Sequence, residues 1–294
     1  MIALKEALKT SPVLVSDGAW GTFLYEKGLS PGECPELWNV DHPDKVLEIA
    51  RSYVDAGADI ILTNSFGGSK YKLMSYHLEK RVFELNKAAA EISRKAAGKN
   101  VYVLGSVGPT GVILMMGEHS PQDLYNTFKE QAMALSEGGA DGILMETMSD
   151  LEEAVLAVRA AKENTTREVL CTMTFTKTPQ NEFRTMMGVS PEQAVEELIA
   201  AGADIIGANC GNGTAGMIEI VKVIRKINKD VPVLIHANAG LPHFHDGKTI
   251  YPESPEVMAE QIKDLIEAGA NIIGGCCGTT PEHIRRIVSI VKKF

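Results

Sequence analysis

Residues 55–64 read DAGADIILTN, and three later stretches repeat that pattern: GGADGILMET at 138–147, AGADIIGANC at 201–210 and AGANIIGGCC at 268–277. In each copy a helical segment ends at glycine, the residue that most readily takes the left-handed conformation that closes a helix. A short run rich in Ile, Leu and Val follows, as expected of a strand buried on both faces of a parallel sheet. The copies, roughly 65 to 80 residues apart, therefore mark four helix-to-strand junctions.

Four further apolar runs lie between these copies, at Val13–Ser16, Val101–Ser106, Val169–Phe175 and Val231–His236. Apolar residues at i, i+3 and i+4 in the intervening segments predict helices, for example over Leu151–Lys162. Eight strands that alternate with helices predict an α/β fold of the (β/α)8 TIM-barrel type.

Four Ser-Pro or Thr-Pro pairs predict helix starts, because the hydroxyl caps the helix and proline needs no partner at its first position. The pairs are Ser120-Pro121, Ser190-Pro191, Ser254-Pro255 and Thr280-Pro281.

An open doubly wound sheet is the alternative architecture. It would call for a G-x-G-x-x-G turn after the first strand, and the chain instead has DGAWGT at 17–22. No low-complexity segment or linker divides the chain, so residues 1–294 are expected to form one barrel domain.

The composition excludes several classes of partner. Apolar residues make up 45% of the chain and the net charge is −9, without a run of basic residues, which argues against nucleic acids and anionic membranes. No apolar stretch approaches the ~20 residues that span a bilayer, and Met1–Val15 lacks the features of a secretory signal. We therefore expect a cytoplasmic protein.

The five cysteines point to a metal rather than to disulfides, because their number is odd and the chain is expected to be cytoplasmic. Cys210 ends one predicted strand, and Cys276 and Cys277 end another. Since catalytic residues of a (β/α)8 barrel gather at the C-terminal ends of its strands, these three thiols are expected to converge. Cys34 and Cys171, taken alone, are expected to be ordinary buried residues.

Three thiolates with no fourth cysteine suit a catalytic zinc site, in which one tetrahedral position stays open. Adjacent side chains on a regular strand point to opposite faces, so Cys276 and Cys277 can share one ion only where the strand breaks. Gly274, Gly275 and Gly278 make such a break inexpensive.

Three thiolates also indicate a type of chemistry. They give a Zn²⁺ site a formal charge of −1, so the ion is a poor Lewis acid and a further thiolate bound to it stays electron-rich. Such a site suits alkyl transfer to sulfur better than hydrolysis.

Several polar residues at predicted strand ends are candidate substrate contacts. Asp17 and Glu146 could hold the ammonium group of an amino acid, and backbone N–H groups of the Asp17-Gly18 turn could hold its carboxylate. Asp17 could equally cap a turn. Asn64, Ser65 and Ser106 lie at the ends of the second and third strands.

Two alternative sites are weaker. His243 and His245 form an H-x-H pair that could bind metal, although such pairs in polar loops are more often solvated. Lys177, just past the fifth predicted strand, could form a Schiff base as in barrel aldolases, although nothing beside it suggests a lowered pKa.

Several motifs together resemble the homocysteine S-methyltransferase family over essentially the whole chain. They are DGAWGT at 17–22, Asn64, Glu146-Thr147, GANC at 207–210 and GGCCGTTPEHI at 274–284. The resemblance implies that Cys210, Cys276 and Cys277 bind Zn²⁺, that the homocysteine thiolate takes the fourth position, and that Asp17, Gly18 and Glu146 contact the substrate.

Within that family, DGAWGT, NAGLP at 238–242 and CCGTTP at 276–281 are similar to the N-terminal homocysteine domain of cobalamin-dependent methionine synthase. This likeness implies that Asn238 is a zinc ligand that substrate displaces. That enzyme carries pterin-binding and cobalamin-binding domains after this one, whereas the present chain ends at Phe294. A separate methylated corrinoid protein is therefore the expected methyl donor. The segments at 111–120 and 240–254 could form its docking rim or pack as ordinary loops.

Two further hypotheses remain open. The same enzyme could take its methyl group from S-methylmethionine, S-adenosylmethionine or betaine, or methylate a different thiol. Outside this class, the cysteines could form a redox switch or a zinc store on a barrel of other chemistry.

Overall fold

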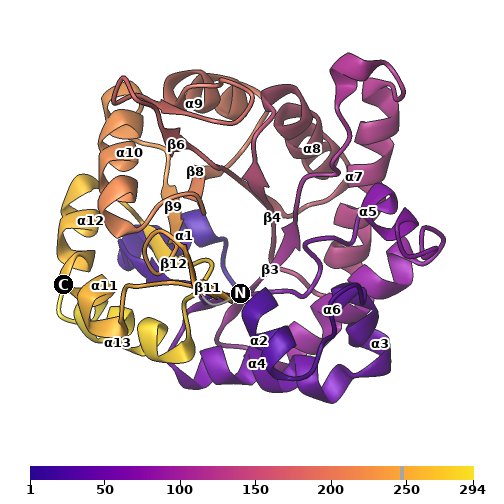
Figure 1. The fold of residues 1–294 in the computed structure, drawn as a ribbon, viewed down its shortest axis with the longest axis horizontal. Helices are drawn as coiled ribbons and strands as arrows, with labels where there is room; N and C mark the ends of the chain where they lie inside the picture. Colours follow the sequence, from indigo (N-terminus) through magenta and orange to yellow (C-terminus); the bar gives the residue numbers. More distant parts are fainter. Residues whose placement is uncertain (246–247) are drawn as a thin grey trace.

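The barrel that the repeats predict is present in the computed structural model, which describes residues 1–245 and 248–294. Its eight parallel strands are β1 (Leu14–Val15), β2 (Ile60–Leu62), β3 (Tyr102–Val107), β4 (Gly142–Met148), β5 (Glu168–Met173), β8 (Ile205–Asn209), β9 (Val233–Ala237) and β12 (Ile272–Gly275). They pair in the order β1-β12-β9-β8-β5-β4-β3-β2. A parallel bridge between Ser16 and Ile60 joins the two ends of the sheet, so the strands form a ring (Figure 1).

A helix follows each strand and covers the outside of the ring (Figure 1). The eight main helices are α4 (Pro43–Asp55), α6 (Val82–Ala97), α7 (Pro121–Glu137), α8 (Leu151–Asn164), α9 (Pro191–Ala200), α10 (Thr214–Ile227), α12 (Ile262–Ala268) and α13 (Pro281–Val291). Shorter helices are α1 (Leu4–Thr10), α2 (Gly21–Glu26), η1 (Pro35–Leu37), α3 (Trp38–Asp41), α5 (Lys70–Met74), η2 (Leu114–Met116) and α11 (Pro255–Glu260). Two hairpins, β6 (Thr176–Lys177) with β7 (Phe183–Arg184) and β10 (His243–His245) with β11 (Lys248–Ile250), lie outside the ring.

The predicted helix starts are confirmed. Ser120 and Ser190 each accept a hydrogen bond from the backbone N–H three residues later, and the third residue of the helix bonds back, which completes a capping box. Ser254 caps α11, and Thr280 opens a capping box at α13.

The four sequence repeats share one local structure. The glycine of each copy, at 57, 139, 202 and 269, has φ between 94° and 112°, as its helix-closing role requires. The Asp or Asn two residues later bonds twice to one residue of the preceding strand. In the second copy, Asp141 donates its N–H to the Val103 carbonyl (2.7 Å) and accepts the Val103 N–H on Oδ2 (2.8 Å). Asp59, Asp204 and Asn271 bond in the same way to Val15, Val169 and Val233. The repeat therefore encodes a clamp between neighbouring strands.

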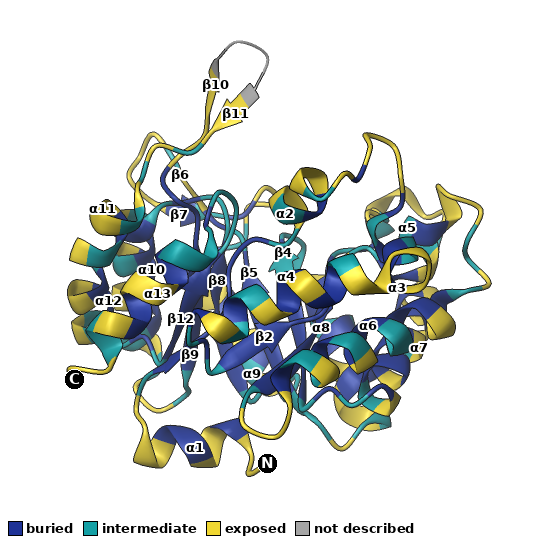
Figure 2. Ribbon diagram, turned by 90° about the horizontal axis from the view of Figure 1, so that it is seen from below, coloured by how far each residue is buried: buried dark blue, intermediate teal, exposed yellow. Residues whose placement is uncertain are grey.

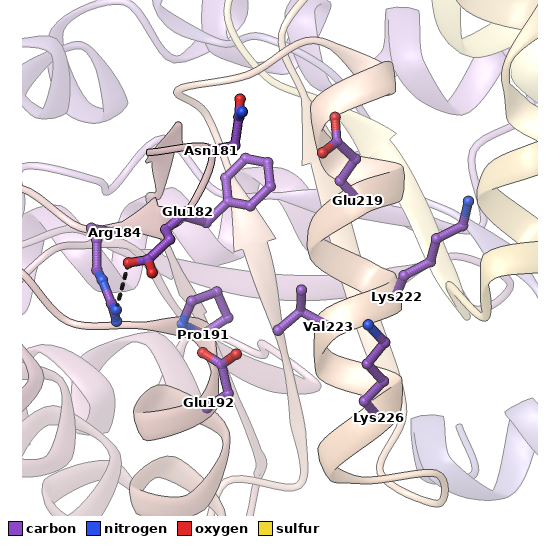
Figure 3. A pocket seen from close by; sticks show the side chains of 10 residues that line it. Asn181, Glu182, Arg184, Pro191, Glu192, Glu219, Lys222, Val223 and Lys226 are labelled. Carbon is purple, nitrogen blue, oxygen red and sulfur yellow. Dashed lines mark hydrogen bonds and ion pairs between the residues drawn. The ribbon is translucent and has the colours of Figure 1, made fainter. Parts of the chain in front are cut away.

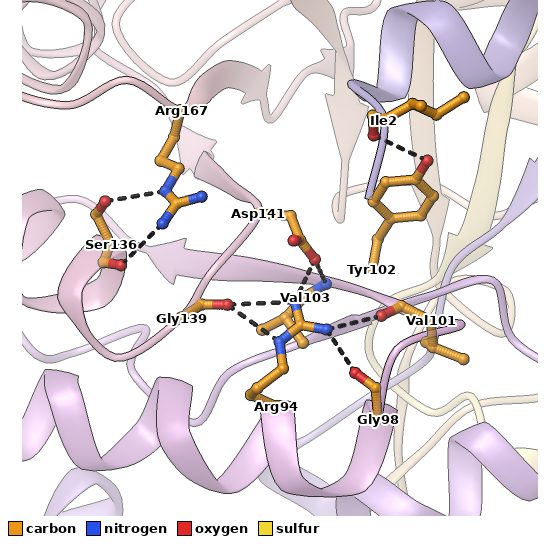
Figure 4. A network of polar contacts seen from close by, with 10 residues as sticks. All are labelled: Ile2, Arg94, Gly98, Val101, Tyr102, Val103, Ser136, Gly139, Asp141 and Arg167. Carbon is orange, nitrogen blue, oxygen red and sulfur yellow. Dashed lines mark hydrogen bonds and ion pairs between the residues drawn. The ribbon is translucent and has the colours of Figure 1, made fainter.

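An arginine reinforces this clamp in two of the copies. Arg94 of α6 donates to the carbonyls of Gly98, Val101 and Gly139 and pairs with Asp141, as Figure 4 shows. Arg225 of α10 makes the equivalent bonds to Val231, Gly269 and Asn271. Each arginine thus ties the end of its own helix to the next helix-closing glycine.

Replacing Arg94 with methionine is expected to lower the free energy of unfolding by about 2–3 kcal/mol, because several carbonyls and Asp141 lose a charged donor. Arg81→Met is the matched control, since Arg81 pairs with Glu84 at the surface, where an ion pair contributes at most about 1 kcal/mol. Urea denaturation measures both. Equal losses would show that the clamp adds nothing to an ordinary surface pair.

One end of the barrel is closed by α1, which lies beneath the ring in Figure 2. Leu4, Ala7 and Leu8 pack against a cluster that takes a Leu or Ile from every strand of the ring. The Glu168 carboxylate accepts the N–H groups of Leu4 and Lys5 at the start of the helix. The substrate must therefore enter from the opposite end, where the strands terminate. In the part of the chain that the structure describes, no helix is long and apolar enough to cross a membrane.

Candidate metal and substrate site

A cavity of 360 Å³ opens at the C-terminal ends of the strands. Its wall takes residues from β2, β3, β4, β9 and β12 and from the segments that follow β1, β2, β8 and β12. The predicted site residues among its lining are Gly18, Asn64, Ser65, Ser106, Glu146, Cys210, Cys276 and Cys277.

The three predicted cysteines lie together. Cys277 Sγ is 4.0 Å from both Cys210 Sγ and Cys276 Sγ, and all three sulfurs lie within 4.8 Å of one another. A tetrahedral ion with Zn–S bonds of ~2.3 Å would hold sulfurs about 3.8 Å apart, whereas a disulfide needs ~2.05 Å. The spacing therefore fits three ligands of one ion.

The backbone breaks where the adjacent pair requires it. β12 ends at Gly275, so Cys276 and Cys277 lie beyond the regular strand. The Cys276 N–H donates to the Ala237 carbonyl (2.7 Å), and the Cys277 carbonyl accepts from Ala239 (3.0 Å). Gly278 has φ 81°, and a side chain there would collide with the ring of Tyr251. The glycine is thus required twice, for its conformation and for its lack of a Cβ.

The sulfur cluster favours negative charge on Cys210. Hydrogen bonds from the Cys276 and Cys277 thiols lower the pKa of Cys210, and the same contacts raise the pKa of Cys276. Three neighbouring thiols cannot all ionise without a cation to balance them, so the donor set matches a soft divalent ion such as Zn²⁺.

Asn238 supplies an independent sign that something binds here. Its side chain is 3% exposed and contacts Cys210, yet Oδ1 has no hydrogen-bond partner. A buried acceptor without a partner costs about 1–3 kcal/mol, which a metal ion would remove. The residues present therefore fit the zinc ion that the cysteine pattern suggests, and Asn238 as its fourth ligand stays a prediction.

Glu146 points into the cavity from the end of β4. Its Oε1 accepts a hydrogen bond from the Ser106 hydroxyl, and its side chain is 8% exposed. The pKa of Glu146 is raised to about 7, mainly by burial. The hydrogen bond from Ser106 lowers this pKa, and the charges of Asp17 and Cys210 raise it. A buried carboxylate whose pKa lies near 7 is well suited to pair with a cation.

Asp17 is fully buried and is not part of the cavity wall. Its Oδ2 accepts the indole N–H of Trp20 (2.8 Å) and the N–H of Leu62 (2.7 Å). Burial raises its pKa to about 7. The Asp17 carboxylate therefore fixes Trp20, which does line the cavity, and a direct contact between Asp17 and substrate stays a prediction.

The remaining predicted residues hold the loops in place. Asn64 donates to the Pro35 carbonyl (2.7 Å), and the Ser65 hydroxyl donates to the Ser106 carbonyl (2.7 Å). These hydrogen bonds fix the cavity wall, and a contact of either side chain with substrate stays a prediction.

Comparison with known proteins agrees with this geometry. The family described as "Homocysteine S-methyltransferase" matches residues 14–291. The chain belongs to that family. Similar relatives are the methionine synthases of Mycobacterium leprae (strain TN), 32% identical, and Mycobacterium tuberculosis (strain ATCC 25618 / H37Rv), 33% identical. The alignments cover 96% and 95% of this chain, which spans only about a quarter (24%) of each relative.

The fold of this chain also matches solved structures. The homocysteine methyltransferase MmuM from Escherichia coli in its metallated form has a TM-score of 0.80, 21% identity and coverage of 98% of this chain and 99% of MmuM. Its oxidised form has the same TM-score and coverage at 23% identity. At these identities the likeness shows the barrel fold alone.

Several cavity residues were not predicted from the sequence. Trp20, Tyr25 and Phe66 bring aromatic rings, and Glu36 and His236 bring buried polar groups. His236 lies on β9, and its position at the end of a predicted strand was the one sequence feature that could have identified it as a cavity residue. Phe66 lies in a loop, and Trp20 and Tyr25 lie at the N-cap and within the short helix α2, where sequence periodicity gives no direction for a side chain.

Among the residues that the structure describes, neither alternative site gathers a comparable set of ligands. Lys177 is exposed, and its ammonium pairs with the carboxylate of Glu219 (2.7 Å). His243 is exposed, and the side chain of His245 lies outside the described residues. Cys34 and Cys171 are buried and are not part of the sulfur cluster, and burial raises the pKa of both thiols.

A second hollow of 410 Å³ lies on the outside of the barrel, between the β6–β7 hairpin and the helices α9 and α10 (Figure 3). Charged side chains of both signs line it, including the ion pair of Glu182 with Arg184. It holds none of the predicted site residues.

Proposed function

We propose that the chain holds a zinc ion with Cys210, Cys276 and Cys277 and methylates homocysteine on sulfur to give methionine. Three sulfurs about 4 Å apart at the mouth of a barrel cavity carry the proposal. The unpartnered Asn238 Oδ1 supports it, because it offers the displaceable fourth ligand. Three free thiols also suit the reducing conditions of the cytoplasm, where we propose that the protein acts.

The bound zinc ion would supply the charge that keeps the homocysteine thiol, whose free pKa is about 8.5, deprotonated at neutral pH. Asn238 would hold the ion together with the three cysteines when no substrate is bound. Glu146 attracts the ammonium group, and the turn at Gly18 lies where the carboxylate would bind. The sulfur then attacks the methyl carbon; the new C–S bond takes a lone pair from sulfur, and the electrons of the broken bond leave with the donor.

We propose a methylated corrinoid protein as the donor. The relatives are methionine synthases of which this barrel is about a quarter, which is consistent with a methyl donor that a further protein module presents. The rim of the cavity end is also apolar and accessible. Exposed side chains there are Met115, Met116, Met186, Leu241 and Phe244. The β10–β11 hairpin stands clear of the barrel at that end (Figure 2).

A second donor class has an observation of its own. Trp20, Tyr25 and Phe66 line the cavity together with the Glu36 carboxylate. Aromatic faces near a carboxylate favour onium cations, so S-methylmethionine, S-adenosylmethionine or betaine could bind in the same space.

Turnover of zinc-loaded protein with homocysteine distinguishes these donors. We expect methionine formation with methylcobalamin, raised further when a methylated corrinoid protein presents the same group. Turnover with an onium donor and not with methylcobalamin or the corrinoid protein would contradict the corrinoid donor and favour the onium class. No methionine with any of the four small-molecule donors or with the corrinoid protein would contradict homocysteine as the acceptor.

Homocysteine affinity is expected to rise with pH through about 7. Burial raises the pKa of Glu146 to about 7, so its proton is lost only above that pH, and only the ionised carboxylate attracts ammonium. Ionisation of the thiol strengthens binding in the same direction at higher pH. Calorimetry across this range should therefore show a step near pH 7 that Glu146→Gln lacks. An identical profile for both proteins would remove Glu146 from substrate binding.

A further inference from the structure

Asn209, the last residue of β8, joins the two most strained positions of the site. Its side chain is fully buried. Oδ1 accepts the backbone N–H of Thr147 (2.7 Å) and the hydroxyl of Thr172 (2.8 Å), and Nδ2 donates to the Thr147 hydroxyl (2.7 Å). One amide therefore bonds to both the backbone and the side chain of Thr147.

Thr147 needs such support because its φ is 62°. A β-branched residue in the left-handed region is a genuine outlier, because its Cβ then crowds the following carbonyl oxygen. The pairing of β4 with β5 shifts register between Met145 and Met148, so this residue lies in a bulge. Bulges re-aim neighbouring side chains, and the neighbour here is Glu146.

The other strained residue follows Asn209 directly. Cys210 has φ 58°, and its N–H donates to the His236 carbonyl (3.0 Å). Displacement of the Asn209 side chain would therefore disturb Glu146 through Thr147 and Cys210 through the chain itself. Backbone strain at functional sites persists only when surrounding contacts enforce it.

We propose that Asn209 is a positioning residue that fixes Glu146 and Cys210 relative to each other, and so sets the distance between the ammonium and thiol subsites. This inference rests on the proposed function, since it concerns how the same cavity binds an amino-acid thiol. Asn209 acts through its two neighbours and contacts neither metal nor substrate.

Asn209→Ala tests the proposal, with Asn86→Ala as the matched control. Asn86 is also fully buried and makes three side-chain hydrogen bonds, to Gly68, Val82 and Gln131. Both variants should lose thermal stability. Only Asn209→Ala should weaken homocysteine binding to zinc-loaded protein, by at least tenfold in calorimetry, and release zinc faster to a chelator.

A second substitution asks whether the bonds to Thr147 are the cause. Glycine adopts a positive φ without cost, so Thr147→Gly in the Asn209→Ala background should recover at least threefold of the lost affinity. If Asn209→Ala fails to fold, Asn209→Asp retains both accepting bonds, and losing the Nδ2 donor should still weaken binding at least threefold.

Wild-type affinity and zinc retention in Asn209→Ala would overturn the proposal, as would equal losses in Asn86→Ala. Wild-type protein that takes up zinc but binds no homocysteine would instead contradict the proposed function. Zinc release from the two alanine variants would then still decide whether Asn209 positions Cys210.

Discussion

Replacing Cys210 with alanine is expected to abolish zinc binding and methyl transfer together. Only two sulfurs and a displaceable amide would remain as ligands, so the zinc ion is lost. Its positive charge then no longer stabilises the substrate thiolate. We expect bound zinc to fall from about one ion per chain to under a tenth, and turnover to fall by at least ~10²-fold. Elemental analysis and a methionine assay measure the two.

Cys171→Ala is the matched control. Cys171 is a fully buried thiol in β5 that belongs to the core rather than to the sulfur cluster. Its replacement should cost about 1–2 kcal/mol of stability and leave zinc content unchanged. Full zinc occupancy in Cys210→Ala would show that the ion binds elsewhere.

Glu146→Gln is expected to weaken homocysteine binding by about 10²-fold, which corresponds to the roughly 2–3 kcal/mol that a charged hydrogen-bonding partner contributes. The amide keeps the size of the side chain and its contact with Ser106 but carries no charge. Glu153→Gln is the control, because Glu153 is also buried and accepts from Thr110 but does not line the cavity.

Although Glu146→Gln should bind homocysteine more weakly, its folded state should be no less stable than that of the wild type. Since the folded-state pKa of Glu146 is raised, the ionised carboxylate destabilises the fold as pH rises through about 7. Glutamine removes that penalty, so the melting temperature at pH 8 should match or exceed that of the wild type. A melting temperature that falls together with affinity would mean that Glu146 serves structure rather than substrate.

The barrel was predictable because its information is local. Each repeat carries its own helix-closing glycine, its own buried strand and the Asp or Asn of the strand clamp, so all eight strands lie within the predicted apolar runs or a residue of them. The convergence of Cys210 with Cys276 and Cys277 followed from topology alone, because parallel strands of a closed barrel end on one rim.

What the sequence did not predict depends on tertiary contacts. Asp17 ends a strand like Glu146, and its carboxylate accepts hydrogen bonds from Trp20 and Leu62 that no sequence pattern indicates. The left-handed backbone at Thr147 exists because Asn209, from a strand 62 residues away in sequence, bonds to it. Likewise, the amphipathic segment Leu4–Thr10 became the floor of the barrel only through contacts with strands along the whole chain.

X-ray absorption at the zinc edge, without and with homocysteine, tests the central claim most directly. The account predicts about one zinc ion per chain with three sulfur ligands at ~2.3 Å and one oxygen or nitrogen ligand, which a fourth sulfur replaces when homocysteine binds. A chain that binds no zinc, or a zinc ion whose ligands do not change when homocysteine is added, would contradict it.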